Sequence, residues 1–442
     1  MHFLKGFTIM DRGYNSGDML NGNRSHILRF IHKNKICTRA QISSYLGLTP
    51  ASITKTMATL INSGLVEETG FIQGEKGRRS IGIALRSDSV KVIGVKLSRR
   101  NYAIGVFDLT GNIVSNRFET IREFEELSDV LRKIKSEIIN CIERHNVVAI
   151  GMAVPGPFFE NEGHVMLVTE TEGWSDINLQ EYFSNAFPIP MIIKHDANTV
   201  ALAEWLIGNK PGENFKTIVS FVLGEGVGAG VLIDGTTLSG SNGIAAEIGH
   251  ISLDINGPRC DCGNYGCLEL YCSSINFVKN AKEQLHDYPD SLLHQYSPLT
   301  YNSIFEAAQS GDELAIKLVK RVGRYVGYGA INLIIAYDPD SILISSDLSK
   351  GGEILLEEIR KVVRERVSDK ICKNVNIEFS RLQDDSILCG AAAVAIDYCL
   401  QNPEHLLEMT KKQNPEHLPE TAKNKSAYQH SKRSFLSSNQ IT

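Results

Sequence analysis

The sequence predicts an α/β protein in which an N-terminal winged helix-turn-helix precedes a duplicated α/β body. Three observations support this fold class. Residues 23–86 show the periodicity of three short helices followed by two strands. From residue 90 onward, a β-hairpin followed by a strand and a helix occurs twice. The composition is that of a folded protein, with 42% apolar and 22% charged residues over a length of 442.

The predicted parts follow the changes of pattern along the chain. Residues 1–22 carry Asp11, Asp18 and several glycines, so we expect a flexible leader there. Residues 23–86 form the winged helix-turn-helix and residues 87–400 form the body. Residues 401–442 are polar and contain a repeated Gln-Asn-Pro-Glu-His-Leu motif, which predicts a disordered or loosely helical tail.

In the N-terminal part, the second and third helices have recognisable start signals. Thr38 is placed to cap the second helix, and Thr49-Pro50 opens the third, with threonine as the N-cap and proline at the first helical position. The third helix carries an apolar stripe made of Ile53, Met57, Leu60 and Ile61. Two strands follow, near residues 65–66 and 81–85, and the polar loop between them has the character of a wing.

In the body, the predicted strands and helices fall into two similar groups. The first group has four strands, at residues 92–95, 102–107, 147–154 and 191–193. Its helices are predicted at about 123–144 and 197–206. The second group repeats the pattern with strands at 217–223, 230–233 and 342–344.

The charge distribution sets the first 86 residues apart from the rest. They hold 12 Lys and Arg against 5 Asp and Glu, whereas the remainder holds 34 basic and 46 acidic residues, so the net charge of -5 conceals a basic N-terminal part. A basic module on an acidic body indicates a polyanionic partner for that module, and DNA is the polyanion that suits a winged helix.

Six residues are candidates for the DNA contact. The apolar stripe of the third helix faces inward, so short polar side chains and one lysine near its N-terminus must face outward, toward base edges and phosphates. Two arginines at the wing tip suit phosphates or a minor groove. The candidates are Ala51, Ser52, Thr54 and Lys55 on the helix, with Arg78 and Arg79 on the wing. The alternative is a winged helix that docks on another protein.

The chain has no pattern of a membrane or secreted protein. No apolar run approaches the roughly 18 residues that a membrane span needs. The first 20 residues lack the continuous apolar core of a secretory signal, so we expect a cytoplasmic protein. Nine cysteines, an odd number, do not indicate a disulfide framework in such a chain.

The strongest chemical signal is a metal-binding pattern. His250, Cys260, Cys262 and Cys267 have the spacing H-x9-C-x-C-x4-C, and glycines among them permit tight turns. Three thiolates and an imidazole suit a tetrahedral Zn²⁺, and four protein ligands would make the ion structural. We expect one zinc ion per chain. The alternative is that these cysteines are small buried apolar residues.

Two further motifs point to a ligand. Asp196 follows a strand at its carboxyl end, where it could face a ligand and act as a general base. It could instead be the N-cap of the next helix. The glycine-rich stretch 224–230 also follows a strand, but Glu225 opposes phosphate binding there, and close strand packing explains the glycines equally well.

Together these residues resemble the ROK family of repressors and sugar kinases, over residues 23–400. Residues 257–269, with the preceding Gly249-His250, are similar to the family's zinc signature almost letter for letter. With the winged helix, the chain resembles the repressor branch, nearest to the xylose-repressor type. The resemblance implies a two-lobed actin-like (hexokinase-like) body with a sugar in its cleft. It also implies operator DNA as a partner of a homodimer or a dimer of dimers.

The resemblance also implies which residues bind the sugar, namely Asp196, Glu247, His250 and Glu269. Asp196 takes the position of the kinases' catalytic base. Family kinases carry an acidic residue and glycines in the first phosphate turn, where this chain has Lys96, and usually a threonine where it has Glu225. His195 also departs from the family's usual asparagine, and residues 171–174 lack its usual asparagine before the tryptophan.

These departures predict a sugar-binding body without kinase activity, in which Asp196 has no catalytic role. We therefore expect a transcriptional repressor of sugar-utilisation genes, whose operator affinity responds to xylose or another monosaccharide. One alternative is a sugar kinase with an added DNA-binding domain. Another is a repressor that senses a protein instead of a sugar.

Overall fold

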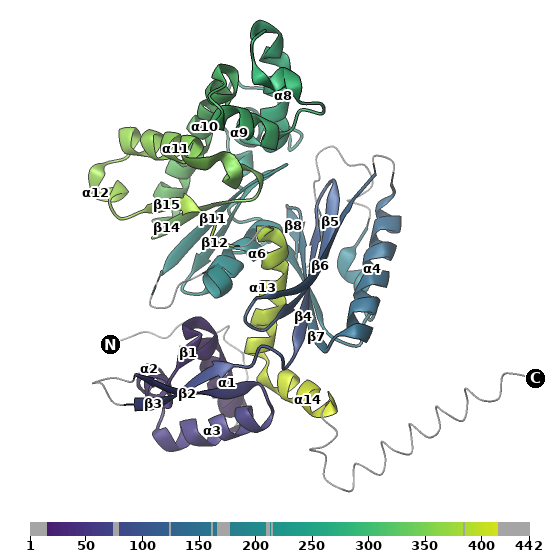
Figure 1. The fold of residues 1–442 in the computed structure, drawn as a ribbon, viewed down its shortest axis with the longest axis vertical. Helices are drawn as coiled ribbons and strands as arrows, with labels where there is room; N and C mark the ends of the chain where they lie inside the picture. The colour runs from purple at the N-terminus through teal and green to yellow at the C-terminus, as the bar shows by residue number, and fades with distance from the viewer. Residues whose placement is uncertain are drawn as a thin grey trace, which may run out of the picture.

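The structure is a computed structural model that describes residues 16–73, 79–122, 125–160, 162–165, 177–208, 213, 215–382 and 385–413. Figure 1 shows three parts: a small N-terminal domain and two larger lobes, each built on a sheet. The predicted fold class, a winged helix-turn-helix followed by a two-lobed α/β body, is confirmed. None of the helices among the described residues is long and apolar enough to cross a membrane.

The N-terminal domain is a winged helix-turn-helix with a three-stranded sheet of order β1-β3-β2. Thr38 and Thr49 accept the capping hydrogen bonds of the second and third helices, as predicted. The apolar faces of all three helices meet in one core, which includes Ile27, Ile42 and Met57. The elements are α1 (Ser16–Asn34), β1 (Ile36–Cys37), α2 (Arg39–Leu46), α3 (Pro50–Asn62), β2 (Val66–Gln73) and β3 (Arg79–Leu85).

Each lobe contains a five-stranded sheet, and the two sheets have the same design. Three antiparallel strands are followed by two parallel ones, in the orders β6-β5-β4-β7-β10 and β13-β12-β11-β14-β15. The first-lobe strands are β4 (Lys91–Leu97), β5 (Asn101–Asp108), β6 (Ile113–Thr120), β7 (Val147–Val154) and β10 (Met191–His195). The second-lobe strands are β11 (Thr217–Leu223), β12 (Val227–Ile233), β13 (Thr236–Thr237), β14 (Ser341–Ser345) and β15 (Asn376–Phe379). This repetition is the duplication that the sequence predicts.

Helices cover the outer faces of both lobes. The first lobe has α4 (Leu127–Arg144), α5 (Leu179–Phe183) and a small hairpin of β8 (Phe158–Phe159) and β9 (His164–Val165). The second has α7 (Glu269–Cys272), α8 (Ser274–Gln284), α9 (Tyr301–Gln309), α10 (Glu313–Tyr337), α11 (Gly352–Arg366) and α12 (Asp369–Cys372). Short 3₁₀ turns join them at Leu285–Asp287, Leu292–Gln295 and Asp347–Gly351. A further 3₁₀ turn, Ile248–His250, lies ahead of α7.

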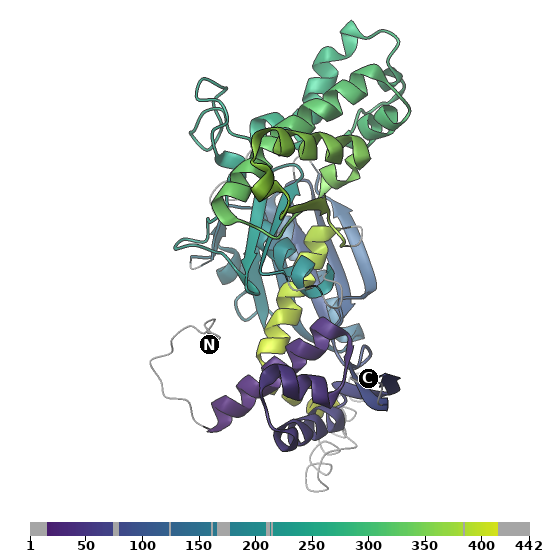
Figure 2. The same ribbon diagram turned by 90° about the vertical axis from the view of Figure 1, so that its left-hand side faces the viewer.

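Two helices occupy the space between the lobes. Helix α6 (Asp196–Ala203) packs on β11 and β12 of the second lobe, and α13 (Ser386–Gln401) packs on β4 and β7 of the first. The two helices also contact each other. Helix α13 continues down to α1, where Figure 2 shows the N-terminal domain crossing its lower end.

Both predicted ends of the chain differ from the structure. Helix α1 already begins at Ser16, inside the stretch predicted as a leader. Residues 403–413, predicted as part of a disordered or loosely helical tail, form a defined helix, α14. Leu406 and Leu407 are buried in the core shared by α1 and α13, and this apolar contact stabilises a segment whose composition is otherwise polar. Residues 1–15 and 414–442 lie outside the described residues.

Candidate functional site

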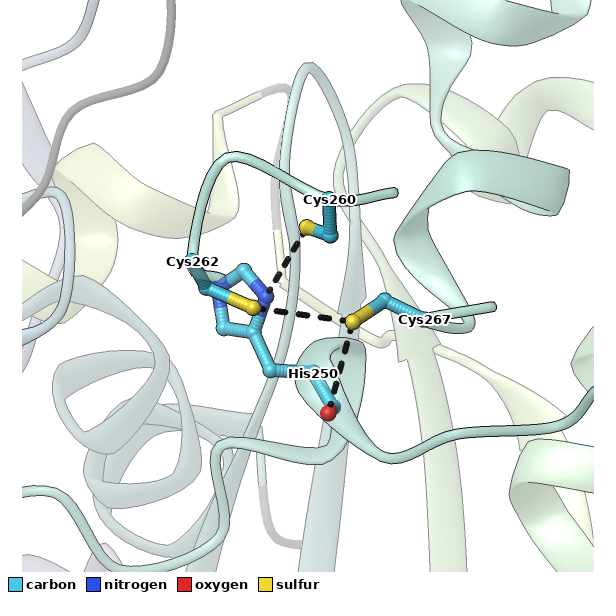
Figure 3. Close-up of side chains that lie close together, drawn as sticks. All are labelled: His250, Cys260, Cys262 and Cys267. Atoms are coloured by element: carbon cyan, nitrogen blue, oxygen red, sulfur yellow. Dashed lines mark hydrogen bonds between the residues drawn. The ribbon is translucent and has the colours of Figure 1, made fainter. Parts of the chain in front are cut away.

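Four side chains form a cluster in the loop between the turn Ile248–His250 and helix α7 (Figure 3). The ligating atoms of His250, Cys260, Cys262 and Cys267 all lie within 4.8 Å of one another. Sγ of Cys260 is 3.8 Å from Nδ1 of His250, and Sγ of Cys262 is 3.6 Å from Sγ of Cys267. The fold therefore brings together the four residues whose spacing suggests a metal site.

The geometry and the donor types of this cluster fit a tetrahedral metal ion. An ion bonded to sulfur and nitrogen at about 2.0–2.3 Å holds its ligands about 3.3–3.8 Å apart, close to the two separations above. Burial raises the pKa of the Cys260 and Cys267 thiols, so the sulfurs need a nearby cation to exist as thiolates. The cluster could hold a metal ion.

A cleft lies between the lobes, at the carboxyl ends of their central strands. Open α/β sheets commonly bind ligands at this edge, because the strands end there and leave loops and helix starts exposed. The lining includes all four residues expected to contact a sugar, Asp196, Glu247, His250 and Glu269. Because Nδ1 of His250 faces the cysteines, its Nε2 is the ring nitrogen left for a ligand in the cleft.

Asp196 is the first residue of α6, so it does not serve as the N-cap of that helix. The cap position is His195, which makes no side-chain capping hydrogen bond. Nε2 of His195 instead lies 3.1 Å from Oδ1 of Asp196, and its Nδ1 lies 3.7 Å from Oε1 of Glu247. One buried imidazole therefore lies between two of the carboxylates expected to bind the sugar.

The charges around His195 outweigh its burial. Burial alone would lower the pKa of His195, but the hydrogen bond that it donates to Asp196 and the charges of Asp196, Glu247 and Glu160 raise it to about 9. Burial raises the pKa of Glu247, against the opposing effects of His195 and His250. A charged His195 imidazolium would compensate part of the negative charge of the neighbouring carboxylates.

Glu269 and the glycine-rich stretch have structural roles as well as a place at the cleft. Oε2 of Glu269 accepts a hydrogen bond from the backbone N–H of Val227 at 2.8 Å, so this carboxylate already fixes the glycine turn. Gly230 lies against α6, where a Cβ would come within 1.9 Å of the carbonyl oxygen of Ala197. Close packing thus explains part of the stretch, while Gly224 and Gly226 line the cleft.

The side of the cleft around Lys96, where the family resemblance implies a phosphate site in the kinases, carries an internal ion pair. Nζ of Lys96 lies 2.9 Å from Oδ2 of Asp385, and both side chains are partly buried. Burial raises the pKa of Glu225, although Arg100, Arg99 and Lys96 oppose this shift. Asp385 also caps α13, since its Oδ1 accepts the N–H of Leu388 at 3.1 Å.

The structure describes five of the six residues expected to contact DNA, and four of these five are exposed. Ala51, Thr54 and Lys55 are exposed near the start of α3, and Ser52 is half-buried. Arg79 is exposed at the start of β3, and Arg78 lies outside the described residues. The face is accessible and polar, as a groove-binding helix requires.

The family model that matches this chain is that of the ROK family, over residues 92–398. The chain belongs to the ROK family. The resemblance drawn from residues 257–269 and the winged helix is thereby confirmed. The match spans both lobes and the metal cluster.

Several transcriptional regulators match along most of the chain. The chain is 27% identical over 391 residues to the xylose repressor of Caldicellulosiruptor bescii, covering 87% of this chain and 97% of the relative. It is 29% identical over 378 residues to the DNA-binding transcriptional repressor Mlc of Escherichia coli K12, covering 84% and 92%. The crystal structure of a ROK transcriptional regulator homologous to Mlc matches with a TM-score of 0.72 and 27% identity, covering 89% and 98%.

The kinases of the family match the body alone. A ROK glucokinase from Streptomyces griseus, solved with glucose and AMPPNP, matches with a TM-score of 0.63 and 27% identity. This match covers 69% of the present chain and 99% of the glucokinase. The match to the glucokinase is thus shorter on this chain than the matches to the xylose repressor and Mlc.

Sequence reasoning missed two members of the site. His195 was noted only as a departure from the family pattern, although its position directly before Asp196 places it at the same strand end. Asp385 gave no signal, because its partner Lys96 lies 289 residues earlier and only the fold brings the two together.

Proposed function

We propose that this protein is a sequence-specific DNA-binding repressor of sugar-utilisation genes, whose operator affinity changes when a monosaccharide binds in the cleft. The observation that carries the proposal is the joining of an exposed, polar recognition helix to a cleft lined by partly or fully buried carboxylates. Carboxylates and an oriented imidazole suit the hydroxyl groups of a sugar, because each can accept a hydrogen bond. The xylose repressor and Mlc are relatives with matching full-length organisation.

We assign the six residues of the DNA face to this function: Ala51, Ser52, Thr54, Lys55, Arg78 and Arg79. The sugar contacts are assigned to Asp196, Glu247, His250 and Glu269. The cluster of His250, Cys260, Cys262 and Cys267 would hold one Zn²⁺ that fixes the imidazole toward the sugar. A homodimer would present two recognition helices to a two-fold symmetric operator.

We infer that the body does not act as a kinase, although a ROK glucokinase matches it. Phosphoryl transfer needs a positioned metal ion and phosphate-binding donors. Here the Lys96–Asp385 ion pair occupies that half of the cleft. A coupled assay of ATP consumption with a panel of sugars tests this inference, and sustained sugar-dependent turnover would favour the kinase alternative.

The experiment that tests the DNA function starts from DNA selected out of a random library by the full-length protein. Lys55→Ala should weaken binding to that DNA and reduce the slope of log affinity against log salt by about one if the lysine contacts a phosphate. Lys361→Ala, an exposed lysine of α11, is the matched control and should leave both quantities unchanged. If the two variants weaken DNA binding equally, helix α3 does not contact the DNA.

The experiment that tests the sugar function measures affinity for the selected DNA with and without D-xylose, D-glucose and N-acetyl-D-glucosamine. A change with one of these sugars that Asp196→Asn abolishes supports the cleft assignment. No change with any sugar, together with tight DNA binding, would favour a repressor that senses a protein.

A further inference from the structure

Arg29 lies on α1 of the DNA-binding domain, at the point where that domain meets the body. Its guanidinium donates a hydrogen bond to the carboxylate of Asp397 on α13. It also lies over the indole of Trp205, with 5.7 Å between its central carbon and the ring centroid. Gln401 donates to the other carboxylate oxygen of Asp397 at 2.5 Å, which fixes the carboxylate toward Arg29. The guanidinium therefore has an ionic and an aromatic partner at once.

These two partners belong to different lobes. Trp205 lies in a π-helical turn, Glu204–Gly208, that continues α6, and α6 packs on the second-lobe sheet. Its indole also packs on the turn after β12, where a Cβ on Gly235 would lie 2.9 Å from the ring. Asp397 belongs to α13, which packs on the first-lobe sheet. A single side chain of the DNA-binding domain thus contacts both lobes.

The two helices that carry these partners both begin at the cleft. Helix α6 starts with Asp196, and α13 starts beside Asp385, which pairs with Lys96. Both helices pack closely on their sheets. For α13, a Cβ on Gly151 of β7 would come within 2.0 Å of the carbonyl oxygen of Ala391 in that helix. Gly390 of α13 also packs closely against Thr199 of α6, so the two helices hold each other as well. A relative movement of the lobes at the cleft would therefore act on the far ends of the helices, where Trp205 and Asp397 lie.

The surroundings of Arg29 leave room for such a movement. A cavity lies between α1 and the body, and residues of α1, α6 and α13 line it, among them Ser25, His26, Asn198, Leu202 and Tyr398. The opposite face of α1 is buried in the winged-helix core through Ile27 and Ile31, so α1 moves with the recognition helix. Near its end, α1 also contacts the first lobe, where His32 lies beside the Asp108–Leu109 turn. Of the two described partners of Arg29, Trp205 is thus the one that reports the position of the second lobe.

We propose that Arg29 is the positioning residue that couples the sugar cleft to the recognition helix, by holding α6 and α13 together in one state of the lobes and releasing Trp205 in the other. This inference rests on the proposed sugar-responsive function and names how that response reaches the DNA. Coupling requires that the contacts differ between the two states, and Arg29 supplies such a difference because its partners sit on separate lobes.

The test compares operator affinity with and without the effective sugar in the full-length protein and in Arg29→Met. The wild type should show a ratio within the usual range for allosteric coupling, roughly 5- to 150-fold, and Arg29→Met should reduce it to less than about two-fold. Sugar binding itself should persist in Arg29→Met, measured by calorimetry, because the cleft is untouched. Asp397→Asn and Trp205→Leu each remove one partner and should reduce the ratio in the same way.

Arg24→Met is the matched control, because Arg24 is on the same helix and donates to Asn21 within it at 3.2 Å. It should retain the wild-type ratio. Arg29→Met could lower the thermal stability and the operator affinity, both with and without sugar, yet keep the ratio of the two operator affinities. In that case Arg29 is merely structural and the proposal is wrong. A variant that folds poorly is replaced by Arg29→Lys, which keeps the charge, loses the planar stacking and should reduce the ratio only in part. If the wild type shows no sugar response, the proposed function fails, and this inference fails with it.

Discussion

The two halves of the cleft differ in how their polar groups are used. In the half expected to hold a sugar, His195 lies between Asp196 and Glu247, and their remaining lone pairs face a ligand site. In the half where the family's kinases hold phosphates, Lys96 and Asp385 pair with each other. Under the proposed function, the body keeps polar groups for a sugar, whereas Lys96, which stands where the family resemblance implies an acidic residue, is engaged in an internal ion pair. The predictions below perturb the sugar half first and the phosphate half last.

The largest effect is expected from the metal cluster, which supports the sugar half through His250. Cys262→Ser should bring the zinc content close to zero and lower the free energy of unfolding by roughly 2 to 5 kcal/mol, because the loop 250–267 loses its cross-link. Metal analysis and urea unfolding measure these changes. The control is Cys272→Ser, since this buried thiol donates to the carbonyl of Leu268 and lies outside the cluster. Equal metal content in both variants would contradict the site.

The second effect concerns sugar recognition itself. Asp196→Asn removes a charged acceptor and should lower affinity for the effective sugar by about 1.5 to 3 kcal/mol, or roughly 10- to 150-fold. Affinity for the selected DNA in the absence of sugar should not change, and the metal should remain bound. Calorimetry and gel retardation measure the two affinities. A variant with the sugar affinity of the wild type would show that Asp196 is not a contact.

The third effect is a pH dependence of the free energy of unfolding, which arises from His195 in the half of the cleft expected to hold a sugar. The pKa of His195 is about 9 in the folded protein, above its ordinary 6.5, because its carboxylate partners outweigh its burial. Its protonation therefore stabilises the folded state fully below about pH 6.5, and this contribution is lost as the pH rises toward 9. Between pH 7.5 and 9.5 the free energy of unfolding should fall by on the order of 1 to 2 kcal/mol.

His195→Gln separates this contribution from those of other groups, because glutamine does not titrate. Its unfolding free energy should change less over the same pH range than that of the wild type. Glu204, whose pKa burial raises to about 7, titrates mostly below this range in both proteins. Identical pH profiles for the two proteins would show that His195 is not charged in the folded state.

The sequence predicts what depends on local chemistry and on periodicity. The caps Thr38 and Thr49, the two groups of strands and the residues of the metal cluster were all identified from patterns within a few dozen residues. The sequence does not predict contacts between distant segments. The docking of α14 depends on Leu406 meeting α1, and the Arg29 contacts join residues separated by more than 170 positions. Polar composition therefore leaves residues 403–413 disordered or loosely helical in the prediction, and does not indicate that they dock as a defined helix.

The smallest effect is expected from the phosphate half. Asp385→Asn removes the charge that pairs with Lys96 but keeps an acceptor for the N–H of Leu388, so α13 should stay capped. A partly exposed ion pair contributes little, and we expect a loss of no more than about 1 kcal/mol in stability. The loss of this ion pair should change sugar affinity by less than about two-fold, because a pair of this kind contributes little free energy. ATP consumption should not appear, because removing one charge supplies neither a metal ligand nor phosphate-binding donors. If Asp385→Asn weakens sugar binding as strongly as Asp196→Asn, the two halves of the cleft do not act separately, and the ion pair is part of the sugar site.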